Sequence, residues 1–214
     1  MHRTTERTVR NAVWRDDPGI AVRELIQNAV EACRYRKHHA SDADRYSPLV
    51  SVIFDRANRT IQVTDNGCGM SKHTVKNHFL TVGSSRSKEP EYATENYASI
   101  ARFGIGFWSV FTIALRAKVE TCSIEHGTLD NRGFSFEVTL DELKDYTVFV
   151  TKALPVGTSV TLHLKPNVIL DDIYERARGH LLSAAVPIKI MFEDEETLVL
   201  PNVSDVTAEQ FLVH

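Results

Sequence analysis

The stretch 20–37 predicts an amphipathic helix, because its apolar residues recur about every four positions: Leu25, Ala29 and Cys33, flanked by Ile26 and Val30. The preceding Asp-Asp-Pro at 16–18 suits the entry to a helix. Two later stretches also have helical character. Residues 71–82 predict a short helix capped by Ser71, and residues 170–184 predict a longer one.

Alternation of apolar and polar residues predicts the strands. Residues 49–65 alternate on both sides of a turn-forming Arg-Ala-Asn-Arg and predict a hairpin. Five further stretches predict single strands: 118–125, 133–140, 147–152, 158–164 and 186–193. The apolar run 107–115 predicts a buried helix, and residues 83–99, almost without apolar side chains, predict a mobile loop. Antiparallel strands segregated from several helices predict an α+β sandwich with one core.

Composition and charge narrow the class of protein. The chain has 214 residues, 43% of them hydrophobic and 25% charged, as in an ordinary soluble globular protein. Its net charge of -3 gives no reason to expect nucleic acid or an anionic membrane as a partner. No apolar run reaches the ~20 residues of a membrane span, and the N-terminal residues are too polar for a signal peptide. We therefore expect a cytoplasmic protein.

Cysteines and histidines show no spacing typical of a metal site. Cys33, Cys68 and Cys122 lack a CxxC pair and are odd in number, so we expect three reduced thiols. The nine histidines are scattered, which favours surface positions over metal ligation.

Two polar residues interrupt the apolar pattern of the first helix. Glu24 and Asn28 are four positions apart and share one face beside the apolar stripe, with the small Ala32 one turn further. An isolated pair of this kind is also typical of a solvated helix edge.

The segment DNGCGM (65–70) follows a predicted strand directly. Asp65 ends that strand, where its carboxylate is drawn toward the core and needs a donor, such as the exocyclic amine of a purine. We expect Gly67 and Gly69 to let a flat base approach the backbone, because a Cβ there would occupy the space. The alternative is a simple turn.

A pair of glycines, Gly104 and Gly106, precedes the apolar run 107–115. Free N–H groups at the start of a helix form an anion site, and glycine lets phosphate oxygens come close to them. Glycines that serve only helix packing are an equally good explanation of this pair taken alone. Gly157 and Thr158 stand at the entrance of a later predicted strand.

Four segments, in this order and spacing, resemble the N box and three glycine boxes of the GHKL ATPase superfamily, which includes gyrase B, HtpG-type chaperones, sensor histidine kinases and MutL. They are RELIQNAVEA (23–32), DNGCGM (65–70), ARFGIGFWSVF (101–111) and GTSVTLHL (157–164). The resemblance covers roughly residues 22–190 and is closest to the HtpG-type chaperones, while MORC and MutL ATPases share the first two boxes nearly as well. It implies a two-layer α/β sandwich, with a mixed, mostly antiparallel sheet covered by helices on one face.

The resemblance implies a role for each matching residue. Glu24 would be the general base that orients the attacking water, and Asn28 would bind Mg²⁺, with Ala32 one turn further along the same wall. Asp65 would accept a hydrogen bond from the adenine amino group of ATP or ADP. The remaining residues implied for the nucleotide are Gly69, Met70 and Thr158 at the base and Gly104, Ile105, Gly106 and Phe107 at the phosphates.

The chain departs from the chaperone pattern within and on both sides of the loop 83–99, which would be the ATP lid. Ala101 replaces a glycine, and His78-Phe79 replaces an Asn-Leu pair. The lid lysine of the chaperones falls on Ser84, which leaves Ser85, Arg86 or Lys88 as substitutes. We take Ser85 as the lid contact.

The resemblance also implies a division of the chain and a function. Residues 1–190 would form the ATP-binding domain, and 191–214 a C-terminal strand or tail leading to a domain absent from this chain. We expect Mg-dependent ATP binding and slow hydrolysis that drive lid closure, as in an HtpG-like chaperone with client proteins and an ATP-dependent homodimer. The alternatives are the ATPase module of a MutL- or MORC-like DNA clamp and a nucleotide-binding regulator without turnover. A sensor kinase fits poorly, because only about twenty residues precede the N box.

Overall fold

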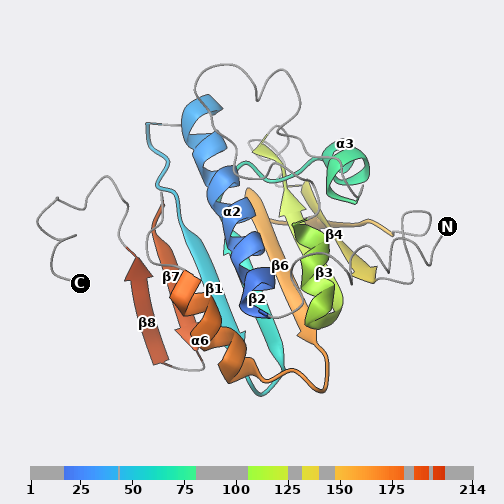
Figure 1. Ribbon diagram of the computed structural model, residues 1–214. Helices are drawn as coiled ribbons and strands as arrows, with labels where there is room; N and C mark the ends of the chain where they lie inside the picture. The colour runs from blue at the N-terminus through green and yellow to red at the C-terminus, as the bar shows by residue number, and fades with distance from the viewer. Residues whose placement is uncertain are drawn as a thin grey trace, which may run out of the picture.

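Helix α2 (Gly19–His39) packs along one face of a β-sheet, as Figure 1 shows. The computed structural model describes residues 17–42, 44–80, 106–124, 132–139, 148–180, 186–192 and 195–200. Within this part, no helix is long and apolar enough to cross a membrane.

Within the described residues, the sheet has eight strands in the order β5-β4-β3-β6-β2-β1-β7-β8. Neighbours pair antiparallel except β1 and β7, which are parallel. The strands are β1 (Val50–Asp55), β2 (Thr60–Asp65), β3 (Ala114–Cys122), β4 (Arg132–Thr139), β5 (Val150–Ala153), β6 (Gly157–Leu164), β7 (Ile188–Phe192) and β8 (Glu195–Leu200). The mixed, mostly antiparallel sheet confirms the expected fold class, and β8 lies in the stretch assigned to a C-terminal strand or tail.

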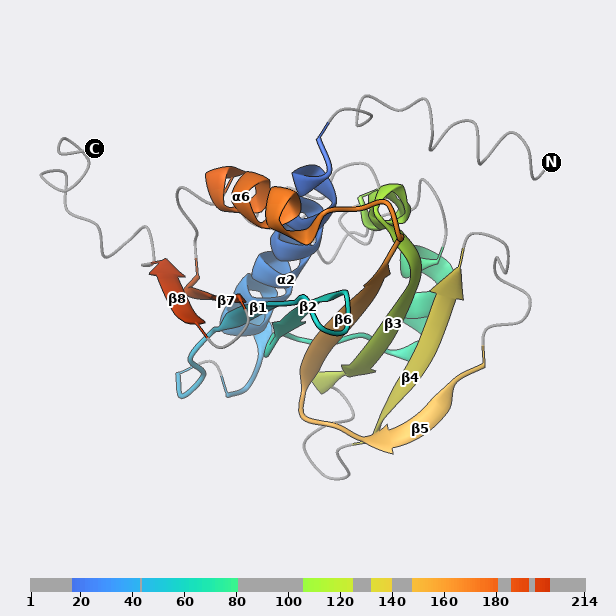
Figure 2. The same cartoon turned by 90° about the horizontal axis from the view of Figure 1, so that it is seen from below.

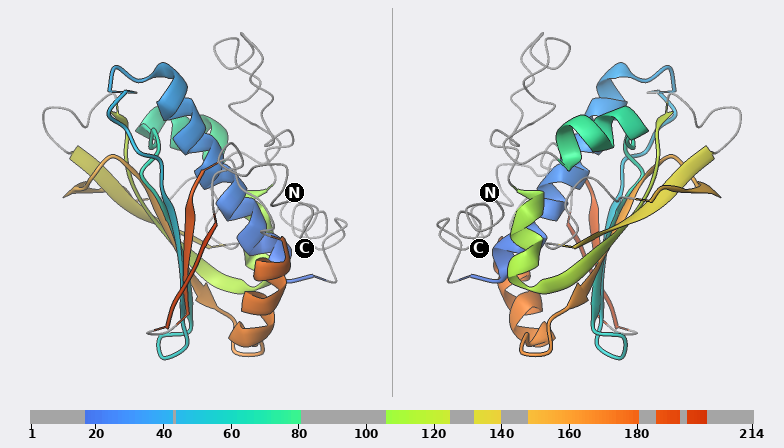
Figure 3. Two further views of the ribbon diagram at one scale, coloured as in Figure 1. Left: turned by 90° about the vertical axis from the view of Figure 1, so that its left-hand side faces the viewer. Right: turned by 90° about the vertical axis from the view of Figure 1, so that its right-hand side faces the viewer.

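In the described part of the chain, helices cover one face of the sheet and leave the other open. Figures 2 and 3 show α2 and α6 (Leu170–His180) on the same side. Inward-facing apolar side chains from alternate strand positions fill the space between the layers, among them Phe54, Ile61, Leu162 and Ile188. The open face carries a polar ladder in which Gln62 donates to Ser159 and Thr161. One covered face and one open face explain the alternation in the sequence.

Local sequence signals position α2. Its first amide, that of Gly19, donates to the carboxylate of Asp17 at 2.9 Å, which confirms the capping entry. A Cβ at Gly19 would lie 2.7 Å from the Cβ of Arg176, so α6 crosses α2 at close range. Buried Leu25, Ile26 and their neighbours orient the helix on the sheet.

Most predicted elements are present, with one correction. The hairpin 49–65 appears as β1 and β2, and Ser71 caps α3 (Lys72–Thr74), which continues as the π-helical η1 (Val75–Phe79). The predicted buried helix 107–115 is present as a shorter 3₁₀-helix, η3 (Phe107–Thr112), and β3 begins at Ala114. The apolar run continues from the helix into the strand, so the pattern does not mark the boundary between them. The predicted helix 170–184 is described to His180.

The loop after β2 packs between α2, β3 and β6 through its glycines. A Cβ at Gly69, where φ is 63°, would lie 1.9 Å from the carbonyl oxygen of Cys122. A Cβ at Gly157, where φ is 131°, would lie 2.1 Å from the carbonyl oxygen of Asp65. Left-handed backbone and these close approaches together require glycine at both positions.

We expect Gly69→Ala to lower the free energy of unfolding by about 2–4 kcal/mol, because alanine is strained at positive φ and its Cβ would displace β3. Chemical denaturation followed by circular dichroism measures the change. Ser51→Ala on the open face is the control, with an expected change below about 0.5 kcal/mol. A Gly69→Ala protein as stable as the parent would contradict this account of the loop.

Candidate functional site

Helix α2 carries two of the predicted site residues on one face. Glu24 and Asn28 are both half-buried, beside the buried stripe of Leu25 and Ala29. Glu24 is held by its neighbour: Arg23 Nη2 donates to Glu24 Oε1 at 3.0 Å, and the Glu24 side chain is 16% exposed. A carboxylate with one oxygen engaged and partial access to solvent is able to orient a water molecule.

Glu24 lies next to Gly106, the second glycine of the pair Gly104 and Gly106. A Cβ at Gly106 would lie 2.7 Å from Glu24 Oε2, so the carboxylate of Glu24 lies close to the backbone of Gly106. The first and third motifs of the sequence are thus brought together. Gly104 and Ile105, the other expected phosphate ligands in this motif, lie outside the described residues, as does Ser85.

The residues after Gly106 belong to the core. Phe107 is 6% exposed, and its ring centroid lies 4.1 Å from that of Phe79. The carbonyl of Gly106 accepts hydrogen bonds from the amide and the hydroxyl of Ser109. Any contact of Phe107 with a phosphate must therefore come from its backbone amide, because its side chain is packed.

Asp65 lies at the end of β2, opposite Thr158 of β6, and is 8% exposed. Burial raises the pKa of its carboxyl group to about 7, although the amides of Gly67 and Thr158 donate to it and Arg36 lies nearby. The Gly67 amide is 2.8 Å from Asp65 Oδ1. Desolvation therefore outweighs the two amide donors that the protein supplies to the Asp65 carboxylate.

The proposed reason for the glycines beside Asp65 is wrong. The space that a Cβ would occupy at Gly67 is filled by α2, since that Cβ would lie 2.7 Å from the Cβ of Ala32. At Gly69 it is filled by the backbone of Cys122. Both glycines allow the protein backbone to pack closely, whereas the expectation was that they admit a base.

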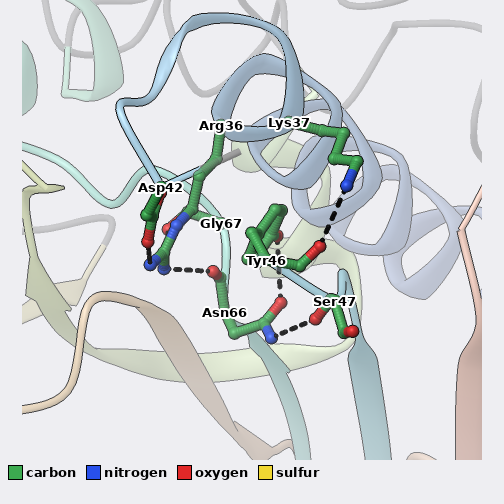
Figure 4. Close-up of polar contacts among 7 residues, drawn as sticks. All are labelled: Arg36, Lys37, Asp42, Tyr46, Ser47, Asn66 and Gly67. Carbon is green, nitrogen blue, oxygen red and sulfur yellow. Dashed lines mark hydrogen bonds and ion pairs between the residues drawn. The ribbon is translucent and has the colours of Figure 1, made fainter. Parts of the chain in front are cut away.

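A polar cluster missed by the sequence analysis holds this loop from behind (Figure 4). Arg36 Nη1 donates to the carbonyl of Asn66 at 2.8 Å, and its Nη2 pairs with Asp42. Asn66 Oδ1 accepts from the Tyr46 hydroxyl at 3.0 Å and from the Leu49 amide at 2.8 Å. Asn66, the residue after Asp65, is thereby tied to the chain leading into β1. The Asp-Asn-Gly sequence of a turn was the available signal for such side-chain bonding.

Buried Cys33 belongs to the same cluster, because its thiol contacts Asn66. Burial raises the pKa of its thiol to about 12, so it stays neutral and donates to Asn66 Oδ1 across 3.6 Å. All three cysteines are free and buried, in agreement with the expected thiols.

Thr121 of β3 joins the second and fourth motifs. Its hydroxyl is 2.9 Å from the Met70 amide, 3.1 Å from the Gly157 carbonyl and 3.0 Å from the Thr158 hydroxyl. Thr121 is 1% exposed. The sequence analysis did not single it out, because a threonine within a strand has no distinguishing signal.

The site therefore consists of two described ends connected by α2. Glu24 and Gly106 form one end. Asp65 and its neighbours form the other, where Ala32 lies against Gly67 and its carbonyl accepts from the Cys68 amide at 3.1 Å. Glu24 and Ala32 are eight residues apart, about 12 Å along a helix. In the described ranges, no group of three or more His, Cys, Asp or Glu side chains could hold a metal ion by itself.

The chain is similar to known proteins. Residues 17–152 match the family described as histidine kinase-, DNA gyrase B-, and HSP90-like ATPase. The chain is similar to proteins named "Chaperone protein HtpG". That of Dechloromonas aromatica is 31% identical over 223 residues, which cover 90% of this chain and 34% of the relative. That of Enterobacter sp. is 34% identical over 199 residues, covering 83% and 30%.

A third relative of the same name, from Aromatoleum aromaticum, is 32% identical over 156 residues, covering 68% of this chain and 24% of the relative. The chain thus spans about a third or less of the length of these relatives. The family match extends over more than half of the chain and includes α2, Asp65 and Gly106. The chain belongs to the family of histidine kinase-, DNA gyrase B- and HSP90-like ATPases.

Proposed function

We propose that the chain binds Mg-ATP along α2 and hydrolyses it slowly, as the nucleotide-dependent module of an HtpG-like chaperone. The observation that carries the proposal is that α2 joins two polar groups of the site: Glu24 lies at Gly106, and Ala32, about 12 Å further along the helix, lies against the loop that follows Asp65. A base pocket at one end and a carboxylate at the other match what ATP hydrolysis needs.

Asp65 binds the base. Its buried carboxylate accepts from the exocyclic amine of adenine, with Thr158 beside it in the paired strand. Met70, partly buried against the core, and the backbone at Gly69 line the base. A purine donor meets the demand that burial creates at Asp65, which supports adenine as the base.

Glu24 and Asn28 act at the phosphates. Glu24 holds and deprotonates the attacking water, with Arg23 engaging only its other oxygen. Asn28 supplies a carbonyl oxygen to Mg²⁺, which neutralises charge on the phosphates when bound. A site with few protein ligands suits Mg²⁺, because this ion keeps waters and takes phosphate oxygens, and the described residues offer no cluster that would bind it without nucleotide.

The remaining contacts extend the sequence hypothesis. Backbone amides at Gly104, Ile105, Gly106 and Phe107 bind phosphate oxygens, and Ser85 contacts them from a lid that closes over the nucleotide. Client proteins and an ATP-dependent homodimer follow from the similarity to HtpG. They concern the longer protein of which such a domain is one part.

Glu24→Ala is expected to leave ADP affinity near that of the parent while reducing ATP turnover by about 10²–10⁴, the contribution of a positioned general base. Calorimetry measures affinity, and phosphate release measures turnover. Glu175→Ala on the outer side of α6 is the control and should change neither. Loss of ADP binding in Glu24→Ala would show that Glu24 is structural and would remove it from the site.

Asp65→Ala is expected to weaken ADP binding by roughly ten- to a hundredfold or more, because a hydrogen bond to a charged group is worth about 1.5–3 kcal/mol. GTP should bind far more weakly than ATP, since guanine places a carbonyl opposite the carboxylate. Equal affinities of GTP and ATP, or full ADP affinity in a folded Asp65→Ala protein, would exclude Asp65 from the site.

Affinity for ADP is also expected to depend on pH. The pKa of Asp65 is raised to about 7, so the accepting carboxylate is lost as the pH falls below that value. Binding should weaken by about tenfold between pH 8 and pH 6. Asp65→Asn lacks this titrating carboxyl group, so it should show a smaller pH dependence than the parent, and this remainder comes from the phosphates of ADP. An ADP affinity of the parent protein that stays constant over this range would contradict an accepting role for the Asp65 carboxylate.

A further inference from the structure

We propose that Thr121 is a positioning residue that fixes the hydroxyl proton of Thr158, so that the base pocket presents only acceptors and selects a 6-aminopurine. This inference rests on the proposed nucleotide site and adds to it a specificity determinant that does not touch the ligand. Three hydrogen bonds of one buried hydroxyl group carry it.

The Thr121 hydroxyl lies behind the pocket wall. It is reached by the Met70 amide at 2.9 Å, the Gly157 carbonyl at 3.1 Å and the Thr158 hydroxyl at 3.0 Å. Thr121 is 1% exposed, so no water competes for these contacts. Its orientation follows from β3, where it pairs with Thr158 across the β3–β6 register.

Counting protons assigns the direction of each bond. A hydroxyl group has one hydrogen and two lone pairs. The Met70 amide can only donate, so it uses one lone pair of Thr121. The carbonyl of buried Gly157 can only accept, so the Thr121 hydrogen points to it. The contact between the two threonines then requires Thr158 to donate to Thr121.

The Thr158 hydroxyl group consequently has only lone pairs to offer to a ligand. Its side chain lies beside Asp65, because the two residues are paired across β2 and β6, and the Thr158 amide donates to the Asp65 carboxylate. An ionised carboxylate and a hydroxyl without a free proton form a wall of acceptors. An exocyclic amine, with two N–H groups, satisfies this wall, whereas a 6-oxo group meets acceptors only and is rejected.

Without the Thr121 oxygen, the Thr158 hydroxyl would be free to rotate. It could then donate to a 6-oxo group, which would improve binding of hypoxanthine, and it would no longer be held as an acceptor for adenine. Each change corresponds to one neutral hydrogen bond, a factor of about two to ten in affinity. The preference for ADP over IDP should fall by about tenfold in Thr121→Val.

The test is calorimetric titration of the 214-residue chain with ADP and with IDP at pH 8.5, where Asp65 is ionised. The proteins compared are the parent, Thr121→Val, Thr121→Ser, Thr158→Val, the double variant Thr121→Val/Thr158→Val and Thr161→Val. Thr161→Val is the matched control, the same substitution in β6 on the open face. Thr121→Ser keeps the hydroxyl and should keep the parental preference, as should Thr161→Val.

Comparison of the single variants with the double variant distinguishes a positioning role of Thr121 from a general effect on the structure. Thr121→Val should reduce the preference about tenfold in the parent but leave it unchanged when Thr158 is already valine, because Thr121 acts through that hydroxyl. An unchanged ADP-to-IDP preference in folded Thr121→Val would overturn the inference and leave the proposed function standing. If Thr121→Val does not fold, Thr158→Val decides, since it keeps the bonds of Thr121 to Met70 and Gly157. A parental preference there would overturn the inference, and a parent that binds neither nucleotide would overturn the proposed function with it.

Discussion

The close approach of α2 to the loop after β2 determines the geometry of the site. The two segments meet at Gly67 and Ala32, where the absence of one Cβ allows backbone contact, and the Cys68 amide donates to the Ala32 carbonyl. The other side of the loop is fixed by the fit of Gly69 against Cys122. Because the loop is held on both sides, Asp65 cannot swing out to solvent. Its position, and hence the proposed base pocket, depends on this packing.

Holding Asp65 in the protein interior has an energetic cost that the protein offsets only in part. Two backbone amides, from Gly67 and Thr158, donate to the carboxylate, and Arg36 contributes a favourable charge. Desolvation still dominates, because the pKa stays raised to about 7. This incomplete compensation supports the proposed role of Asp65 as a binding group. The cluster of Arg36 and Asn66 stabilises the loop without completing this compensation.

Local periodicity was sufficient to predict the elements that position the site. The four-residue repeat of Leu25, Ala29 and Cys33 predicted α2, and the alternation in 49–65 predicted the hairpin that ends at Asp65. The helix after Gly106 was predicted to extend too far, because the apolar run continues into β3 without polar positions that mark the boundary. The sequence analysis also gave the wrong reason for Gly67. Its neighbour Ala32 is 35 positions away in the chain but adjacent in space.

Residues that orient other residues could not be predicted from the sequence, because their partners also lie far away in the chain. Thr121 and Arg36 have no motif of their own, and their importance comes from partners on different elements: Met70 and Gly157 for Thr121, Asn66 and Asp42 for Arg36. Glu24 and Asp65 differ from them, because each stands at a position where the local pattern is broken by a charge. Pattern breaks find the groups that would contact a ligand, whereas the groups that orient them require the fold.

In the proposed site, the group that would bind the base and the group that would act on the phosphates lie apart. Asp65 takes its hydrogen bonds from Gly67 and Thr158, and Glu24 takes its own from Arg23, so the two carboxylates share no partner among the described contacts. About 12 Å of helix lies between their neighbourhoods. Sites this far apart and without common partners are usually energetically independent. Any dependence of one carboxylate on the other must therefore pass through a ligand that spans both ends, which makes the coupling between Glu24 and Asp65 a property of the bound state.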